Sequence, residues 1–255
     1  MLVVVSALKG YAIEASDGCL GTVSDFLFDD KTWKMRWLVV DVGSWLIGRT
    51  VLIHPSAITT ADHEGRKFAV KLTKAQVEGS PDTAQDLPVS RQVEFNLNSY
   101  YGWDPLWAGN SYFGGGAMAS PLLSPPLFGS YLGQANGIGA GADEGDPHLR
   151  SVAAVDGYHL HASDGDIGHL ENLMVEDSTW IIHYLIVDTR NWWPGQHVLL
   201  SPHAVEDISY LDQKIRLNVS CDQVKGSPPW GTETLIDRSY ERALQEYYAW
   251  PGYGW

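Results

Sequence analysis

Short apolar segments separated by turn residues predict β-strands between residues 10 and 72. Apolar and polar side chains alternate from Tyr11 to Glu14, and the Asp17–Gly18 pair after them is a strong signal for a hairpin turn. The later segment Lys34 to Val42 contains a continuous apolar run, as expected of a strand that is covered on both faces. About six strands, with turns roughly every 8 to 12 residues, are typical of a small β-barrel or sandwich.

The hydrophobic spacing then changes to that of an amphipathic helix. Apolar residues recur at every fourth position in two segments, namely Val89, Val93, Leu97 and Tyr101, and much later Ile236, Tyr240, Leu244 and Tyr248. Residues four apart lie on one face of a helix, so we expect each segment to form an amphipathic helix.

Both patterns belong to an internal duplication. Residues 10–52 return as residues 157–199 without a gap, so equivalent positions are 147 residues apart (157 − 10). Trp33 falls on Trp180, for example, and the helical segments obey the same shift. We predict a mainly β protein with three segments: a barrel with its helix at 1–103, a linker rich in glycine and proline at 104–149, and a second barrel with its helix at 150–255.

Composition and charge narrow the choice of partners. Acidic residues outnumber basic ones by 31 to 17, which gives a net charge of −14 and argues against binding to nucleic acid or to anionic lipid. No apolar run approaches the roughly 18 residues of a membrane span, and the apolar N-terminal residues lack basic flanks. Cys19 and Cys221 occupy different places in the two repeats, so they do not form a repeated disulfide framework, and we expect both to be reduced thiols. We therefore expect a cytoplasmic protein.

Several short motifs give each repeat a resemblance to the PRC-barrel domain, the small barrel of the photosynthetic reaction centre H subunit. The first copy carries Asp17-Gly18-x-x-Gly21, Val40-Asp41 and Gly48-x-x-Val51-Leu52-Ile53-x-Pro55, and the second carries Asp164-Gly165-x-x-Gly168, Val187-Asp188 and Gly195-x-x-Val198-Leu199-Leu200-x-Pro202. The resemblance implies a barrel fold and no shared catalytic residue. It also implies a role in assembly or protein interaction.

Equivalent acidic residues of the two copies are candidates for catalytic groups. Asp17 and Asp164 lie in hairpin turns, where aspartate commonly accepts hydrogen bonds from backbone amides. Asp41 and Asp188 end the central strands, where they can cap a turn or, alternatively, handle protons. The motifs of phosphate-binding loops, serine hydrolases and zinc proteases are missing from the sequence. We expect no enzyme, no catalytic residue and no cofactor; hydrolysis by unpaired carboxylates is a third hypothesis.

Histidines concentrate in the second copy and raise the question of a metal site. His159 and His161 are predicted to face the same side of a strand, one arrangement that metal sites use. No third potential ligand lies at a spacing that is typical of metal sites, so the sequence predicts no bound metal. A small ligand or metal, held by these histidines or in a cleft between the barrels, is the alternative function.

Aromatic residues provide the leading hypothesis. Large rings with one polar atom often anchor interfaces. Candidates lie in a glycine-flanked loop and at the end of each predicted helix: Trp45, Tyr100, Tyr101, Trp103, Trp192, Trp193, Tyr247, Tyr248 and Trp250. They can instead pack on their own barrel. We expect a non-enzymatic interaction or assembly module, with the two barrels packed about a pseudo-two-fold axis and a protein partner or self-association.

Overall fold

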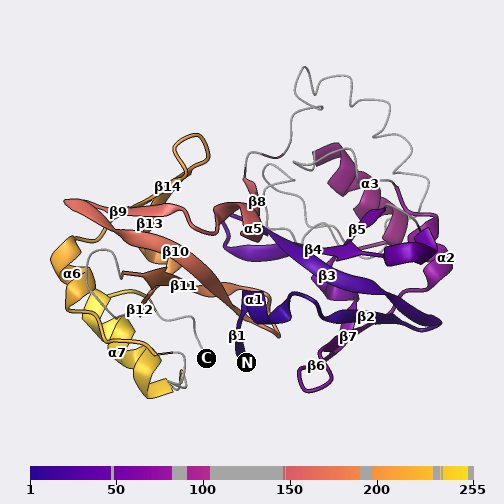
Figure 1. The fold of residues 1–255 in the computed structure, drawn as a ribbon, viewed down its shortest axis with the longest axis horizontal. Helices are drawn as coiled ribbons and strands as arrows, with labels where there is room; N and C mark the ends of the chain where they lie inside the picture. The colour runs from indigo at the N-terminus through magenta and orange to yellow at the C-terminus, as the bar shows by residue number, and fades with distance from the viewer. Residues whose placement is uncertain are drawn as a thin grey trace, which may run out of the picture.

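The computed structural model describes residues 1–46, 49–81, 91–103, 146, 148–189, 197–231, 236 and 238–251. Most of the predicted linker at 104–149 lies outside these ranges, as do Trp192 and Trp193. Within them the chain forms two similar sheets, one for each repeat (Figure 1).

The two sheets have the same order of strands. In the first, the hydrogen-bonded order is β5-β4-β3-β2-β7-β6, and in the second it is β12-β11-β10-β9-β14-β13. The first sheet consists of β2 (Ala12–Ala15), β3 (Gly18–Asp29), β4 (Lys34–Asp41), β5 (Thr50–Ile53), β6 (Ile58–Asp62) and β7 (Lys67–Val70). The second consists of β9 (His159–Ala162), β10 (Gly165–Glu176), β11 (Ile182–Asp188), β12 (His197–Leu200), β13 (Val205–Ser209) and β14 (Lys214–Leu217). The predicted mainly β fold is confirmed, as two barrel-like sheets that do not close among the described strands.

Each sheet is followed by a short helix and then a longer one. The short helices α2 (Lys74–Glu78) and α6 (Cys221–Lys225) each begin with a capping box. In this motif the side chain of the capping residue accepts a hydrogen bond from the backbone amide three residues later, and the side chain of that later residue accepts one from the backbone amide of the capping residue. The long helices α3 (Arg91–Tyr101) and α7 (Arg238–Tyr248) are the amphipathic helices expected from the four-residue spacing.

Gly21 permits a close approach between two strands. It has a φ of +159°, and a Cβ built there would lie 2.0 Å from the carbonyl oxygen of Asp41. Gly168 repeats this geometry, with its Cβ position 2.0 Å from the carbonyl oxygen of Asp188. The strand register shifts beside both glycines, so a β-bulge accompanies each close approach.

The two repeats exchange their first strands. β1 (Leu2–Val4) pairs antiparallel with β10 of the second sheet, and β8 (Leu149–Ser151) pairs antiparallel with β3 of the first. Each strand leads into a single helical turn, α1 (Val5–Leu8) or α5 (Val152–Val155). These elements lie between the two sheets (Figure 1). Each repeat therefore contributes its first strand to the sheet of the other repeat. The sequence patterns did not indicate this exchange.

A pair of backbone hydrogen bonds marks the pseudo-two-fold axis. The amide of Ile182 donates to the carbonyl of Trp33 at 2.7 Å, and the amide of Met35 donates to the carbonyl of Trp180 at 2.8 Å. Each bond is the other shifted by one repeat, because Trp33 is equivalent to Trp180 and Met35 to Ile182. The two barrels thus pack about a pseudo-two-fold axis, as the duplication led us to expect.

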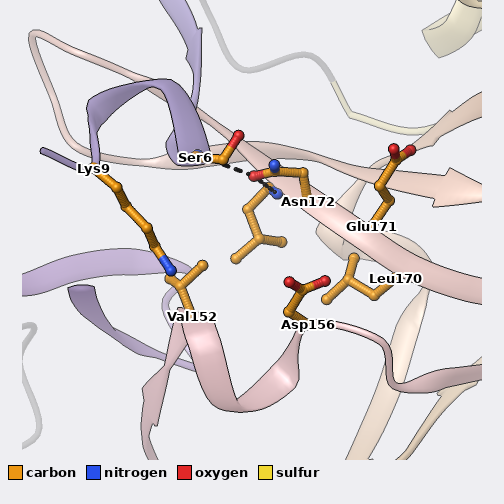
Figure 2. Close-up of a pocket in the computed structure, with 8 residues that line it drawn as sticks. Ser6, Lys9, Val152, Asp156, Leu170, Glu171 and Asn172 are labelled. Carbon is orange, nitrogen blue, oxygen red and sulfur yellow. Dashed lines mark hydrogen bonds between the residues drawn. The ribbon is translucent and has the colours of Figure 1, made fainter. Parts of the chain in front are cut away.

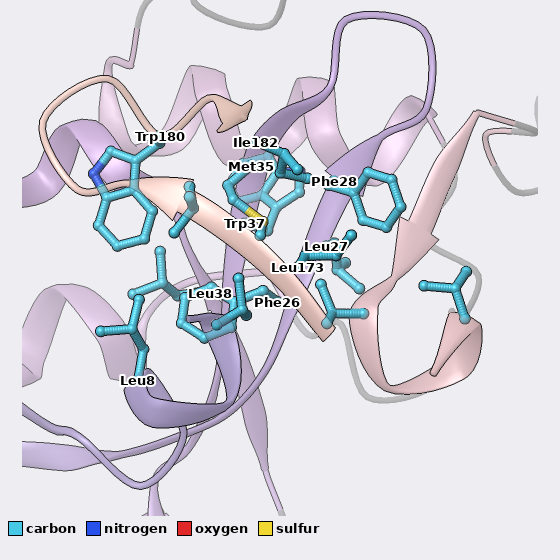
Figure 3. Packing of buried hydrophobic residues seen from close by; sticks show 14 of the residues in the cluster. Leu8, Phe26, Leu27, Phe28, Met35, Trp37, Leu38, Leu173, Trp180 and Ile182 are labelled. Carbon is cyan, nitrogen blue, oxygen red and sulfur yellow. The ribbon is translucent and has the colours of Figure 1, made fainter. Parts of the chain in front are cut away.

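The hydrophobic core is continuous across this axis. Trp180 of the second repeat is 3% exposed, and its ring lies 6.1 Å from that of Phe26 and 5.7 Å from that of Phe68, both in the first repeat. Figure 3 shows Trp180 and Ile182 among side chains of the first repeat, with Ile182 beside Met35. Burying one such aromatic side chain contributes about 1.5–3 kcal/mol, so the two barrels stabilise each other.

Candidate interaction sites

A buried carboxylate attaches each long helix to its own barrel. Glu94 of α3 is 1% exposed and accepts hydrogen bonds from the indole of Trp37 and the guanidinium of Arg36. Glu241 of α7 is 3% exposed and accepts a hydrogen bond of 3.2 Å from the hydroxyl of Tyr184. The repeats therefore keep the glutamate and vary its donor.

Arg36 links three parts of the chain at this point. Its guanidinium lies 3.2 Å from a carboxylate oxygen of Asp29 in β3 and 3.0 Å from one of Asp146, the described residue that precedes β8, and it also binds Glu94. All four side chains are buried, so removing one partner leaves an uncompensated charge. The first turn of α3 and the start of the second repeat are thus held at the same place.

Four of the predicted interface aromatics pack against their own repeat. Tyr101 and Trp103 stack with ring centroids 4.1 Å apart, and Trp103 lies 5.8 Å from Trp37 of β4. Tyr248 and Trp250 stack in the same way at 3.9 Å. These rings fix the end of each helix.

Burial changes the acidity of the tyrosines in these clusters. It raises the pKa of the hydroxyls of Tyr101 and Tyr248 above the ordinary value of 10.0, and the neighbouring serine hydroxyl opposes the rise in each case. Burial also raises the pKa of Tyr240 to about 12. All three side chains therefore stay neutral at physiological pH.

Tyr100 and Tyr247 are the exposed members of the aromatic set. They are 45% and 43% exposed, and each ring stands edge-on to the partly buried tyrosine that follows it, at 4.9 and 4.8 Å. Their hydroxyls donate to the carbonyls of Gln76 and Gln223 at 3.0 and 2.8 Å. We call these two side chains the tyrosine edges. They are held rigidly while part of each ring faces solvent.

Other predicted aromatics cannot be placed in a site. Trp45 belongs to the 3-10 turn Gly43–Leu46, but its side chain lies outside the described part of the structure. Trp192 and Trp193 also lie outside it.

The acidic pairs have structural contacts. Asp17 accepts from the backbone amide of Lys74 at 2.9 Å, and Asp164 accepts from that of Cys221 at 2.7 Å. Each carboxylate thus binds the first turn of a helix 57 residues further on, rather than the hairpin turn itself. Asp41 accepts from the amide of Gly43 at 2.9 Å, which agrees with a capping role.

The histidines of the second repeat form pairs with carboxylates. His159 and His169 are cross-strand neighbours in β9 and β10, and Nδ1 of His161 lies 2.7 Å from Asp166. Hydrogen bonding to His161 holds the pKa of Asp166 below its ordinary value. Among the described residues no group of three or more potential ligands is arranged to hold a metal ion.

A small pocket lies where the two repeats meet. It has a volume of about 30 Å³, and Lys9, Asp156 and Asn172 are among the side chains that line it (Figure 2). This is room for about one water molecule, far below the several hundred Å³ of a typical ligand site. The geometry gives no support to a small-ligand site at this junction.

Comparison with known families places the first barrel. Residues 5–77 match the PRC-barrel domain. The PRC-barrel match contains α1 and the strands from β2 to β7, and it leaves out the exchanged strand β1. The second sheet has the strand order of this PRC barrel, which is consistent with a second barrel of the same kind. No curated protein matches the chain. Among the described residues, no helix is long and apolar enough to cross a bilayer.

Proposed function

We propose that the protein is a soluble, cytoplasmic, non-enzymatic assembly module. In this proposal the two barrels form a rigid bridge, and the tyrosine edges bind a protein partner at each end. The observation that carries it is the paired exposure of Tyr100 and Tyr247, which occupy equivalent positions and are similarly exposed. Packing explains the aromatic rings that are buried in each repeat. It does not explain why both copies hold a tyrosine ring rigidly at the surface, whereas binding to a protein partner does.

The arrangement of the helices supports a bridging role. α3 lies beside the first sheet and α7 beside the second, on opposite sides of the junction between the sheets (Figure 1). The shared core between them resists relative movement of the barrels. A partner with two copies of one binding surface, or two molecules of one partner, would therefore be held at a fixed separation.

A photo-crosslinking experiment tests this function. A crosslinking amino acid is placed at position 100 or at position 247, and the protein is irradiated in a native lysate of the cells that produce it. We expect both positions to capture the same protein, and the Tyr100→Ser/Tyr247→Ser variant to lose it in a pull-down. Leu211→Ser is the matched control, because Leu211 is 99% exposed and lies away from both helices. Unchanged capture by the double variant would contradict the proposal.

A further inference from the structure

Each exchanged segment resembles a docking peptide that adds a strand to the opposite sheet. Residues 2–8 and 149–155 each consist of a three-residue strand and one helical turn. Each strand adds to the edge of a strand in the opposite sheet, where backbone hydrogen bonds supply affinity and side-chain pockets supply specificity.

Apolar side chains at a spacing of three anchor both segments. In the first segment Val5 and Leu8 are both 0% exposed, and in the second Val152 and Val155 are 6% and 1% exposed. The residues between them, such as Ala7, face solvent. Both segments thus bind by the same face of the helical turn.

Polar contacts make the pairing specific for the opposite repeat. Asp30 of the first barrel lies 2.6 Å from the guanidinium of Arg150 and 3.0 Å from Nδ1 of His148. Asp25 accepts hydrogen bonds from the hydroxyl of Ser151 and the amide of Ala153.

The first repeat's own segment cannot supply these side-chain contacts. Val3 and Val4 stand where the second segment has Arg150 and Ser151. If the first barrel bound a segment like its own, Asp30 would lose its partners Arg150 and His148. Asp25 would keep Lys9, 3.4 Å away, but would lose the hydroxyl of Ser151. Both losses cost binding free energy. The first barrel is therefore matched to the segment of the second repeat.

We propose that the two halves of the chain recognise each other as separate partners, with the segments 2–8 and 149–155 as the recognition elements. A second copy of the chain is then a competent partner, since the first half of one copy can pair with the second half of another. Such reciprocal exchange forms all the contacts of the single chain. This proposal does not depend on the tyrosine edges.

Cleavage of the full chain tests it. A protease site is placed between Gly115 and Gly116, the folded protein is cut, and the product is analysed by gel filtration and native mass spectrometry. We expect the two halves to remain a one-to-one pair. After isotope-labelled and unlabelled cut proteins are mixed, we expect mixed pairs of a first and a second half. Two results would overturn the proposal. One is separation of the halves on cutting, and the other is that pairs of two first halves form as often as pairs of a first and a second half.

A matched pair of variants tests the role of the segment. Val5→Asp places a charge at a position that is 0% exposed, and it should weaken the cut pair at least about 100-fold. Ala7→Asp adds the same charge on the exposed side of the same turn and should change the affinity less than about threefold. Equal affinities for the two variants would show that the segment does not carry recognition. Because the isotope-mixing result uses the unmodified segments, it decides the proposal even if Val5→Asp does not fold.

Discussion

At the scale of single residues, Gly21 shows how a side chain that is missing controls the fold. Gly21→Ala would place a methyl group against the backbone of Asp41, whereas Gly43, with a φ of +65°, has no atom within 4 Å of its Cβ position. We expect Gly43→Ala to cost about 1 kcal/mol for its left-handed backbone, and Gly21→Ala to cost about 3 kcal/mol or more. Urea unfolding of the two variants measures the difference. Similar losses would contradict the close approach.

His54 is expected to make stability depend on pH. Burial, followed by the charges of Lys34, Arg36 and Lys71, lowers its pKa to about 3 from the ordinary 6.5. The unfolded chain therefore takes up a proton first as the pH falls, and native stability is lost between about pH 6.5 and pH 3. We expect this residue to account for a loss of about 2–3 kcal/mol by pH 4.5.

The second repeat offers the control substitution for this pH effect. Its equivalent residue is Ser201, whose hydroxyl caps the same kind of 3-10 turn that Nδ1 of His54 caps. His54→Ser should keep the cap and flatten the dependence of unfolding free energy on pH. An unchanged slope in His54→Ser would contradict the assignment.

At the scale of elements, the turn between β10 and β11 acts on the opposite barrel. Trp180 is buried against Phe26 and Phe68, while the equivalent Trp33 is only partly buried. We expect Trp180→Ala to cost about 3–5 kcal/mol, and Trp33→Ala about half of that or less. Denaturant midpoints at constant slope report both values. Equal costs would mean that Trp180 does not complete the first barrel.

The elements also show which features a sequence can reveal. Strands, hairpin turns and the two long helices follow from local signals, such as Asp17–Gly18 and the four-residue apolar spacing, and these predictions agree with the structure. The exchange of β1 and β8 depends on contacts more than a hundred residues apart, such as that between Asp30 and Arg150. Three apolar residues at Leu2 to Val4 do not indicate which sheet they will join. The attachment of α3 through Glu94 does not follow from the sequence, because Glu94 is not one of the apolar positions that define the packed face of the helix.

At the scale of the whole molecule, the two barrels are one folding unit. Small barrels bury a limited fraction of their surface and are marginally stable alone. Here each receives a strand and buried side chains from the other. We expect intact protein to unfold in a single transition, with probes in both repeats reporting the same midpoint. This coupling is what would keep the tyrosine edges at a fixed distance from each other.

The most direct test of the exchange is native-state hydrogen exchange on the Val5→Asp variant of the full chain. Val5 belongs to the first repeat in sequence, but α1 contacts β10 of the second sheet. The account predicts that amides of β10 and its neighbour β9 lose protection by at least about tenfold, whereas Ala7→Asp leaves them unchanged. Loss of protection confined to residues 12–70, with β10 unaffected, would contradict it.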